Sequence, residues 1–182
     1  MSIEREYLQA VVNRFKEVKK LGDNTFEQIG EKEINWTYNS SSNSIAIIVK
    51  HMSGNMISRW TDFLNTDGEK EYRNREKEFT DNISSKEELH TVWENGWKVL
   101  IDSLTNLKEE DLLKTIYIRG EGHLVLEAIE RQMAHYAYHV GQIVYIGKFI
   151  KDTEWKSLSI PKGKSEEYLI EMKEKHKKGI VE

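Results

Sequence analysis

Two histidines four residues apart, His135 and His139, are the residues of this sequence best spaced for metal chemistry. In a helix, residues at that spacing lie on one face, with their Cβ atoms roughly 6 Å apart. Two imidazole nitrogens can then reach one ion at about 2.1 Å each. Such pairs also arise by chance, so the pair predicts a metal site only together with its surroundings.

The surroundings of the pair are uncharged. Residues 132–147 (QMAHYAYHVGQIVYIG) contain no Asp, Glu, Lys or Arg, although charged residues make up 32% of the chain. A solvent-facing helix would carry charges, so we expect this helix to be buried on most sides. A buried imidazole needs a polar partner, and a metal ion would supply one. Gln142 continues the same face and is a candidate to orient a ligand ring or a bound group.

A third histidine, His51, lies in another predicted helix. With Asn55, Ser58 and Asp62 it forms a polar stripe on an otherwise apolar helix. We favour a solvated strip as the explanation; the alternative is one wall of a polar pocket, in which Asn55 would help to orient a bound group. A lone histidine in such a position is more often structural than a ligand. As a ligand, His51 would complete a three-histidine site between two helices.

Composition and motifs exclude several other chemistries. The chain has no cysteine, so it has neither a disulfide nor a cysteine nucleophile. It has no glycine-rich phosphate loop and no G-x-S-x-G elbow, and Tyr136 stands where an HExxH metalloprotease has glutamate. A net charge of −4 gives no basic footprint for nucleic acid. We expect no signal peptide, no membrane span and a cytoplasmic protein.

Predicted helices must position these residues. Apolar residues recur at three and four positions over residues 3–21, 44–64, 89–107 and 123–151, and a short helix is expected from Ser165. Gly22, Asp23 and Asn24 are expected to end the first helix, residues 40–43 to supply caps for the second, and a Ser85–Glu88 capping box to open the third.

The remaining segments are predicted as connections. Residues 35–39 and 115–119 are candidates for short extended pieces, residues 120–122 for a turn, and the charged residues 69–77 for a surface connection. Aromatic residues at helical spacing are expected in the core: Trp60, Trp93, Trp97, Tyr136 and Tyr145. The sequence therefore predicts one all-α domain over residues 1–182, a four-helix bundle with a short β-ribbon and a C-terminal extension.

The order of these features resembles the DinB/YfiT-like superfamily of bacterial four-helix bundles. The resemblance rests on IAIIVKHMSGNMISRW around His51 and on AHYAYHVGQIVYIGK around the histidine pair, with a helix between them, and covers about residues 3–168. The closing WKSLSIPKGKSEEY resembles a sub-branch with no assigned function. The resemblance implies an up-down-down-up bundle, often a homodimer. It also implies one divalent metal, zinc or nickel, held by His51, His135 and His139.

The resemblance also implies two classes of function. In the first, a metal-dependent enzyme activates a low-molecular-weight thiol, as in a bacillithiol-type S-transferase, or activates water for hydrolysis of a small-molecule substrate. In the second, a non-catalytic bundle protein of stress response binds a metal or ligand without turnover. Asn55 and Gln142 are the candidates for catalytic roles, with Asp62 a weaker one, and the sequence does not decide whether the protein is an enzyme.

Overall fold

A computed structural model describes residues 2–80 and 83–176 of the chain, and these are mostly helical. The helices are α1 (Ile3–Gln28), α2 (Ile45–Trp60), α3 (Arg75–Thr80), α4 (Lys86–Thr105), α5 (Val125–Lys151) and α6 (Ser165–Lys175). Short 3-10 turns lie at Glu31–Glu33, Glu109–Asp111 and Asp152–Glu154. Two strands, β1 (Thr115–Ile118) and β2 (Glu121–Leu124), pair antiparallel as a hairpin. Within the described ranges, no helix is both long and apolar enough to cross a membrane.

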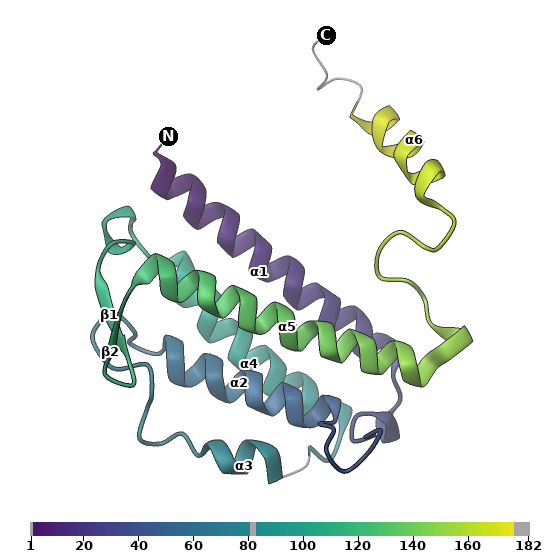
Figure 1. Ribbon diagram of the computed structural model, residues 1–182, viewed down its shortest axis with the longest axis horizontal. Coiled ribbons are helices and arrows are strands. Elements are labelled where there is room, and N and C mark those ends of the chain that lie inside the picture. The colour runs from purple at the N-terminus through teal and green to yellow at the C-terminus, as the bar shows by residue number, and fades with distance from the viewer. Residues whose placement is uncertain (1, 81–82, 177–182) are drawn as a thin grey trace.

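The four long helices pack side by side around one core. Helix α2 packs against α4 and α5, and α1 packs against the same two helices from the other side. Figure 1 shows α1 and α5 running in one direction and α2 and α4 in the other. The hairpin joins the end of α4 to the start of α5, and α3 lies along α2. This arrangement places the middle of α2 opposite the middle of α5.

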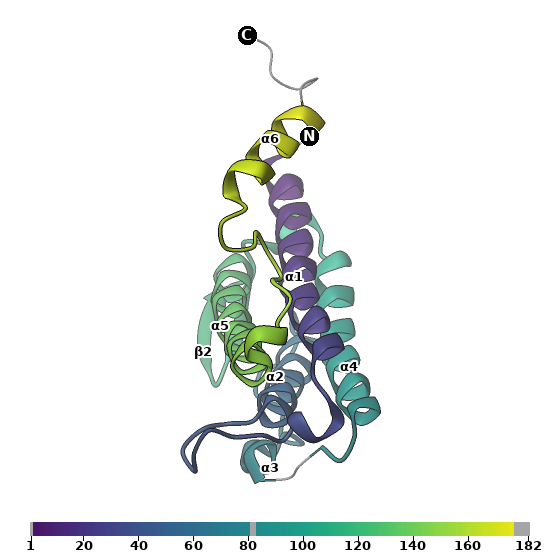
Figure 2. The same ribbon diagram turned by 90° about the vertical axis from the view of Figure 1, so that its right-hand side faces the viewer.

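The predicted C-terminal extension is present as far as the structure describes it. Helix α6 has no buried residue and projects away from the four long helices (Figures 1 and 2). The last residues of the predicted domain, 177–182, lie outside the described part, as do Met1 and residues 81–82.

The core contains four of the five aromatic side chains predicted to lie there. Trp60, Trp93, Trp97 and Tyr136 are each no more than 1% exposed, and Phe15 contacts both Trp97 and Tyr136. The prediction was wrong for Tyr145, which is 70% exposed. Helical spacing sets the face on which a side chain lies, but it does not tell which faces of a helix are covered.

The expectation that residues 132–147 are buried on most sides was also wrong. The outward face of α5 is open to solvent, with Tyr138 63% exposed and Tyr145 70% exposed. Only the face toward α1 and α2 is buried, through residues such as Tyr136, Val140 and Ile143. The segment therefore has one buried face and one exposed face, and the exposed face is also uncharged.

Helix α1 continues past the predicted stop at Gly22 to Gln28. A Cβ at Gly22 would lie 2.5 Å from the Trp93 ring, so this glycine allows α4 to approach closely. Asp23 next to it accepts a hydrogen bond from Nε1 of Trp93 at 2.7 Å. Gly22 and Asp23 therefore serve helix packing here and do not end the helix.

Other predicted boundaries shift by a few residues. Ser44 itself caps α2, where residues 40–43 were expected to, and α2 ends at Trp60. The hydroxyl of Ser85 accepts from the Glu88 N–H, but the Glu88 carboxylate accepts from Ser84, so the predicted capping box is only half formed. Residues 35–39 form no strand.

The connection between α4 and α5 was predicted only in part. The strand-like piece at 115–119 is confirmed as β1, but residues 121–124 form its partner strand β2, so His123 lies in a strand and not at a helix start. The backbone turns at Arg119 and Gly120, which have positive φ angles of 56° and 76°. A tight hairpin of this kind fixes where α5 begins, and hence where its histidines lie relative to α2.

Candidate metal centre

Three imidazole rings from two helices meet between α2 and α5. His51 comes from α2, and His135 and His139 come from successive turns of α5. Each ring offers a nitrogen such that the three nitrogens lie within 4.8 Å of one another. The ring centroids are 5.0 Å apart for His51 and His139 and 5.6 Å apart for His51 and His135. The structure thus brings together the three histidines that the sequence singled out, and they could hold a metal ion.

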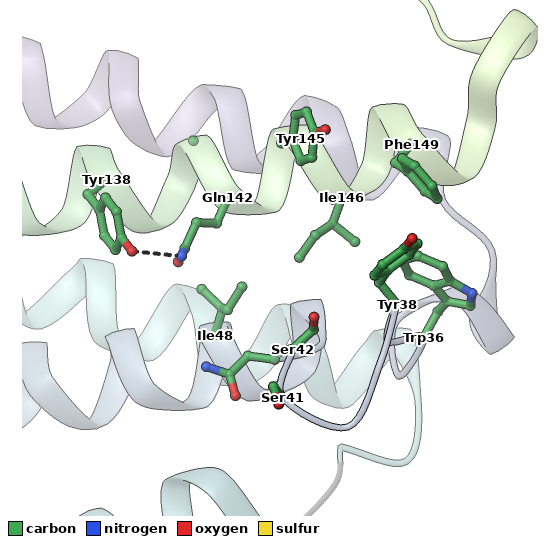
Figure 3. Close-up of a pocket in the computed structure, with 12 residues that line it drawn as sticks. Trp36, Tyr38, Ser41, Ser42, Ile48, Tyr138, Gln142, Tyr145, Ile146 and Phe149 are labelled. Atoms are coloured by element: carbon green, nitrogen blue, oxygen red, sulfur yellow. Dashed lines mark hydrogen bonds between the residues drawn. The ribbon is translucent and has the colours of Figure 1, made fainter.

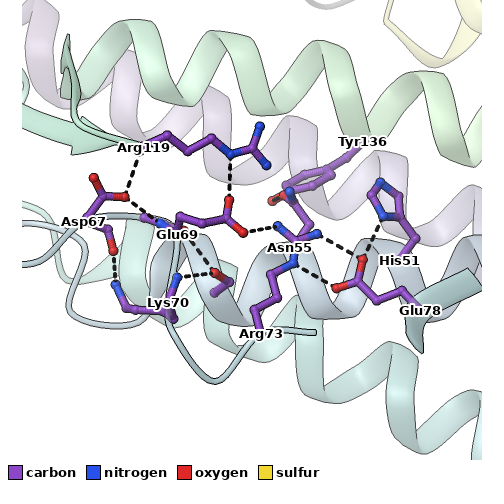
Figure 4. Close-up of polar contacts among 11 residues, drawn as sticks. His51, Asn55, Asp67, Glu69, Lys70, Arg73, Glu78, Arg119 and Tyr136 are labelled. Atoms are coloured by element: carbon purple, nitrogen blue, oxygen red, sulfur yellow. Dashed lines mark hydrogen bonds and ion pairs between the residues drawn. The ribbon is translucent and has the colours of Figure 1, made fainter. Parts of the chain in front are cut away.

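The orientation of His51 is set by a carboxylate. Its Nδ1 donates to Oε2 of Glu78 at 3.0 Å, and both side chains are buried. Figure 4 shows the other ring nitrogen facing away from Glu78, toward α5. A carboxylate on Nδ1 fixes the tautomer that leaves Nε2 with a free lone pair, the form in which histidine binds metals.

Gln142 does the same for His139. Its amide nitrogen donates to the hydroxyl of Tyr138 at 3.1 Å, which leaves its carbonyl oxygen to accept from Nδ1 of His139 at 2.8 Å. Nε2 of His139 is then free of a proton and lies 3.1 Å from Nε2 of His135. Gln142 therefore contacts the His139 ring, while its role in orienting a metal ligand or in catalysis stays a prediction.

The electrostatic setting keeps the rings on α5 neutral. Burial lowers the pKa of His135 to about 4, and the positive charges of its neighbours, including Arg59 and Arg73, act in the same direction. Burial likewise lowers the pKa of His139, although the bond to Gln142 opposes that shift. Since only a neutral imidazole can bind a metal, both groups are in the ligand form at neutral pH.

Glu78 is held in its charged form. Burial would raise the pKa of its carboxyl group, but hydrogen bonds from His51 and Arg73 outweigh burial and lower it. Nε of Arg73 donates to Oε1 of Glu78 at 2.8 Å, and Nη2 donates to Oε2 at 3.0 Å. This two-point contact, visible in Figure 4, locks the carboxylate that orients His51.

The donor set fits a divalent transition metal. Two nitrogens each 2.1 Å from a tetrahedral ion lie about 3.4 Å apart, close to the 3.1 Å between the Nε2 atoms of His135 and His139. Three neutral imidazoles suit zinc, nickel, copper and iron, so the donor set does not choose among them.

The polar stripe of α2 is buried, contrary to the solvated strip that we favoured. His51, Asn55 and Ser58 are 7%, 6% and 0% exposed, while Asp62 lies beyond the end of the helix in solvent. The Oδ1 atom of Asn55 accepts from the hydroxyl of the buried Tyr136 at 2.8 Å, and Trp60 donates to the same hydroxyl at 3.2 Å. Asn55 is therefore fixed one turn from His51.

Sequence reasoning missed the buried carboxylate and its partner. Residues 69–77 were expected to be a surface connection, yet the Arg73 side chain is only 3% exposed, and Glu78 follows directly. A signal existed in α2, where Gly54 lies one turn from His51. A Cβ there would lie 2.3 Å from Oε1 of Glu78, so this glycine makes room for the carboxylate.

Two hollows flank the histidines. The smaller, with a volume of about 190 Å³, contains His51 and His135 and is here called the arginine pocket; its other lining residues are Asn55, Arg59, Arg73, Arg75, Arg119, Arg131 and Gln132. The larger, of about 770 Å³, is here called the aromatic groove and is shown in Figure 3. Its aromatic side chains are Trp36, Tyr38, Tyr138, Tyr145 and Phe149.

Comparison with known proteins gives a family and no function. A search of curated proteins finds no match. A family model described as "Protein of unknown function (DUF1572)" matches residues 2–164, which include all three histidines, Glu78 and both hollows. The chain therefore belongs to the DUF1572 family of proteins of unknown function.

Proposed function

We propose that this protein is a metal-dependent enzyme of DinB/YfiT-like, four-helix-bundle type that activates a thiol or water on one divalent metal. The observation that carries the proposal is the convergence of His51, His135 and His139, whose ring nitrogens lie within 4.8 Å of one another. Zinc and nickel are the metals we expect. The antiparallel pairing of α1 and α5 with α2 and α4 agrees with the up-down-down-up bundle that the resemblance implies.

An open coordination position distinguishes catalytic from structural metal sites, and three protein ligands leave one. His51 and His135 both line the arginine pocket, so a reactant in this pocket would lie next to a metal held by the histidines. A bound metal there would lower the pKa of a coordinated thiol or water and so supply a nucleophile near neutral pH. A hollow next to two of the three ligands favours turnover of a small molecule over a purely structural ion.

The chain's own residues would position the reactants. Glu78 holds His51 in its ligand tautomer, and Gln142 holds His139. Asn55 lines the arginine pocket with its amide oxygen engaged by Tyr136, so its amide nitrogen is the group left to donate to a substrate. Glu78 is tied to Arg73 and His51 and is therefore a poor general base. Activation of a thiol, which needs no separate base once coordinated, suits the site better than hydrolysis.

Elemental analysis of purified protein tests the metal site. We expect about one zinc or nickel per chain in the wild type and a loss of most metal in His135→Ala. His176→Ala, which changes a histidine at the end of α6, is the matched control and should keep its metal. Equal metal content in His135→Ala and the wild type would remove the proposed site.

A second assay addresses turnover. Metal-loaded protein is incubated with a low-molecular-weight thiol and a panel of small electrophiles, and thiol consumption is followed. We expect consumption that disappears in His135→Ala and after chelation. No consumption with any pair, in protein that does hold its metal, would favour binding without turnover.

The expected partners remain part of the proposal. They are a small-molecule substrate, a low-molecular-weight thiol and a second copy of the chain, with neither nucleic acid nor membrane. Light scattering after size exclusion would measure the homodimer, and cell fractionation would test the cytoplasmic location.

A further inference from the structure

Most arginines of this chain line a single pocket, the arginine pocket. Five of the seven arginines in the sequence line this pocket, whereas none of the much more numerous lysines does. They come from four separate segments: α2, the approach to α3 with its first residue, the turn of the hairpin, and α5. Arginine differs from lysine in offering a planar fork of donors that matches a carboxylate or phosphate. The choice of residue, and not only the charge, therefore indicates recognition of an oxyanion.

Arg59 is the central residue of this group. It is 5% exposed, and its Nε and Nη1 atoms are buried without a hydrogen-bond partner among the described residues. A buried guanidinium without a partner is costly in free energy. The neighbouring loop holds its side chain in place, since a Cβ at Gly68 would lie 2.9 Å from Nη1. Two fixed, buried donors without an acceptor are what a binding site for an anion would present.

Gln132 adds a second unpartnered group to the same pocket. It is 3% exposed, and its amide oxygen is buried without a donor among the described residues. Rotation of the amide by 180° would place its NH₂ group there, as a further donor to an anion. Gln132 precedes His135 by one turn of α5, and both residues line the arginine pocket.

The pocket keeps an excess of positive charge. Glu78 is engaged by Arg73, and Glu69 by Arg119 at 2.9 Å, but no acidic side chain in the described part of the chain lines the pocket itself. Arg131 pairs with no carboxylate in the described part of the chain, and its Nη1 lies 3.4 Å from Nε2 of His123. The three histidines are neutral as ligands, so a bound divalent metal would keep its full charge and add to this field.

We propose that the arginine pocket binds an oxyanion group, a carboxylate or a phosphate, of the substrate. Arg59 and Gln132 form its inner wall, and Arg119 and Arg131 lie at its rim. The volume of about 190 Å³ suits one such group and a few further atoms. The catalytic role of this pocket rests on the proposed function. If the histidines hold a metal, an anion in the pocket would bring the rest of a small substrate close to it.

The test is titration calorimetry of the full chain at low ionic strength, with inorganic phosphate in one arm and malonate in the other. Each arm is run on chelated and on metal-loaded protein. We expect at least one anion to bind the chelated wild type and to bind Arg59→Gln about 10- to 100-fold more weakly. Arg14→Gln is the matched control, because Arg14 lies on α1 in an exposed pair with Glu17, and it should bind like the wild type.

A variant at the rim keeps the test decisive if Arg59→Gln does not fold, which circular dichroism would reveal. Arg131→Gln changes an exposed side chain, and a several-fold weaker anion affinity is expected. Binding unchanged in both variants, or in whichever of them folds, would overturn the proposal, and so would the absence of binding in both arms. Metal content separates this result from the proposed function: an anion bound by protein that takes up no metal refutes only the metal site, whereas metal without anion binding refutes only the oxyanion pocket.

Discussion

The arginine pocket and the aromatic groove are lined by successive stretches of α5, residues 131–135 and residues 138–149, and they differ in volume and in charge. The groove has about four times the volume, but in the described part of the chain no charged side chain lines it. The pocket is small and lined by five arginines and two histidines. Gln142 borders the groove and His135 borders the pocket, so the histidine cluster separates them.

This difference shows that volume is a poor guide to chemistry in this molecule. The groove offers apolar surface, ring faces and a few uncharged polar groups, and no charged side chain of the described residues lines it. The pocket offers ligand nitrogens, fixed donors and an excess of positive charge. We therefore expect substitutions at the pocket to change metal and anion binding, and substitutions in the groove to leave both unchanged.

The largest difference is expected from two glycine-to-alanine substitutions. In Gly54→Ala the new methyl group would lie 2.3 Å from Oε1 of Glu78, so the carboxylate that orients His51 must shift from its position. Loss of such a partner lowers metal affinity by about 10- to 100-fold. Metal affinity is measured by competition with a chromogenic chelator.

Gly141→Ala is the matched control, because a Cβ at Gly141 in the groove meets nothing within 4 Å. It should keep the wild-type metal affinity and stabilise α5 by up to about 1 kcal/mol, since alanine favours a helix over glycine. Equal metal affinities in the two variants would show that Glu78 does not support the site.

A smaller effect is expected from pH on the chelated protein. The pKa of His135 is lowered to about 4, below the value of about 6.5 expected in the unfolded chain. Between these values the unfolded chain binds a proton that the folded chain does not, so stability falls as the pH falls from 6.5 toward 4. Thermal unfolding of the wild type should therefore lose more stability over this range than that of His135→Leu. Parallel curves for the two proteins would contradict a buried, neutral His135.

The smallest effect is expected in the groove. Tyr145 is 70% exposed, so Tyr145→Ser should change the free energy of unfolding by no more than about 0.5 kcal/mol. Metal content and phosphate affinity should equal those of the wild type. A loss of either would mean that the groove and the pocket act as one site, and the comparison would fail.

Local spacing made part of this site predictable. His135 and His139 share a helix face by the helical period alone, and Gln142 follows from the same period. His51 was tied to them by resemblance, because no local rule says which helices pack together. The four long helices were predicted from apolar periodicity, while Gly22 was misjudged because its partner, Trp93, is about 70 residues away in the sequence.

The rest of the site depends on tertiary contacts. Glu78 and Arg73 lie in a charged connection whose composition indicates solvent, and only the fold turns them toward His51. The rim of the arginine pocket needs the hairpin turn at Arg119 to lie opposite Arg131 on α5. Gly54 was a signal present in the sequence, but it gains meaning only once its neighbours are known, and the preference for arginine over lysine is visible only among the residues that line the folded pocket.

X-ray absorption spectroscopy of zinc-loaded protein tests whether the three histidines bind one ion, because it counts the ligands of the metal. We expect three imidazole nitrogens at about 2.0–2.1 Å, with one further light atom, and the loss of one imidazole in His51→Ala. A zinc ion bound by fewer than three imidazoles in the wild type, or mainly by carboxylates, would contradict it.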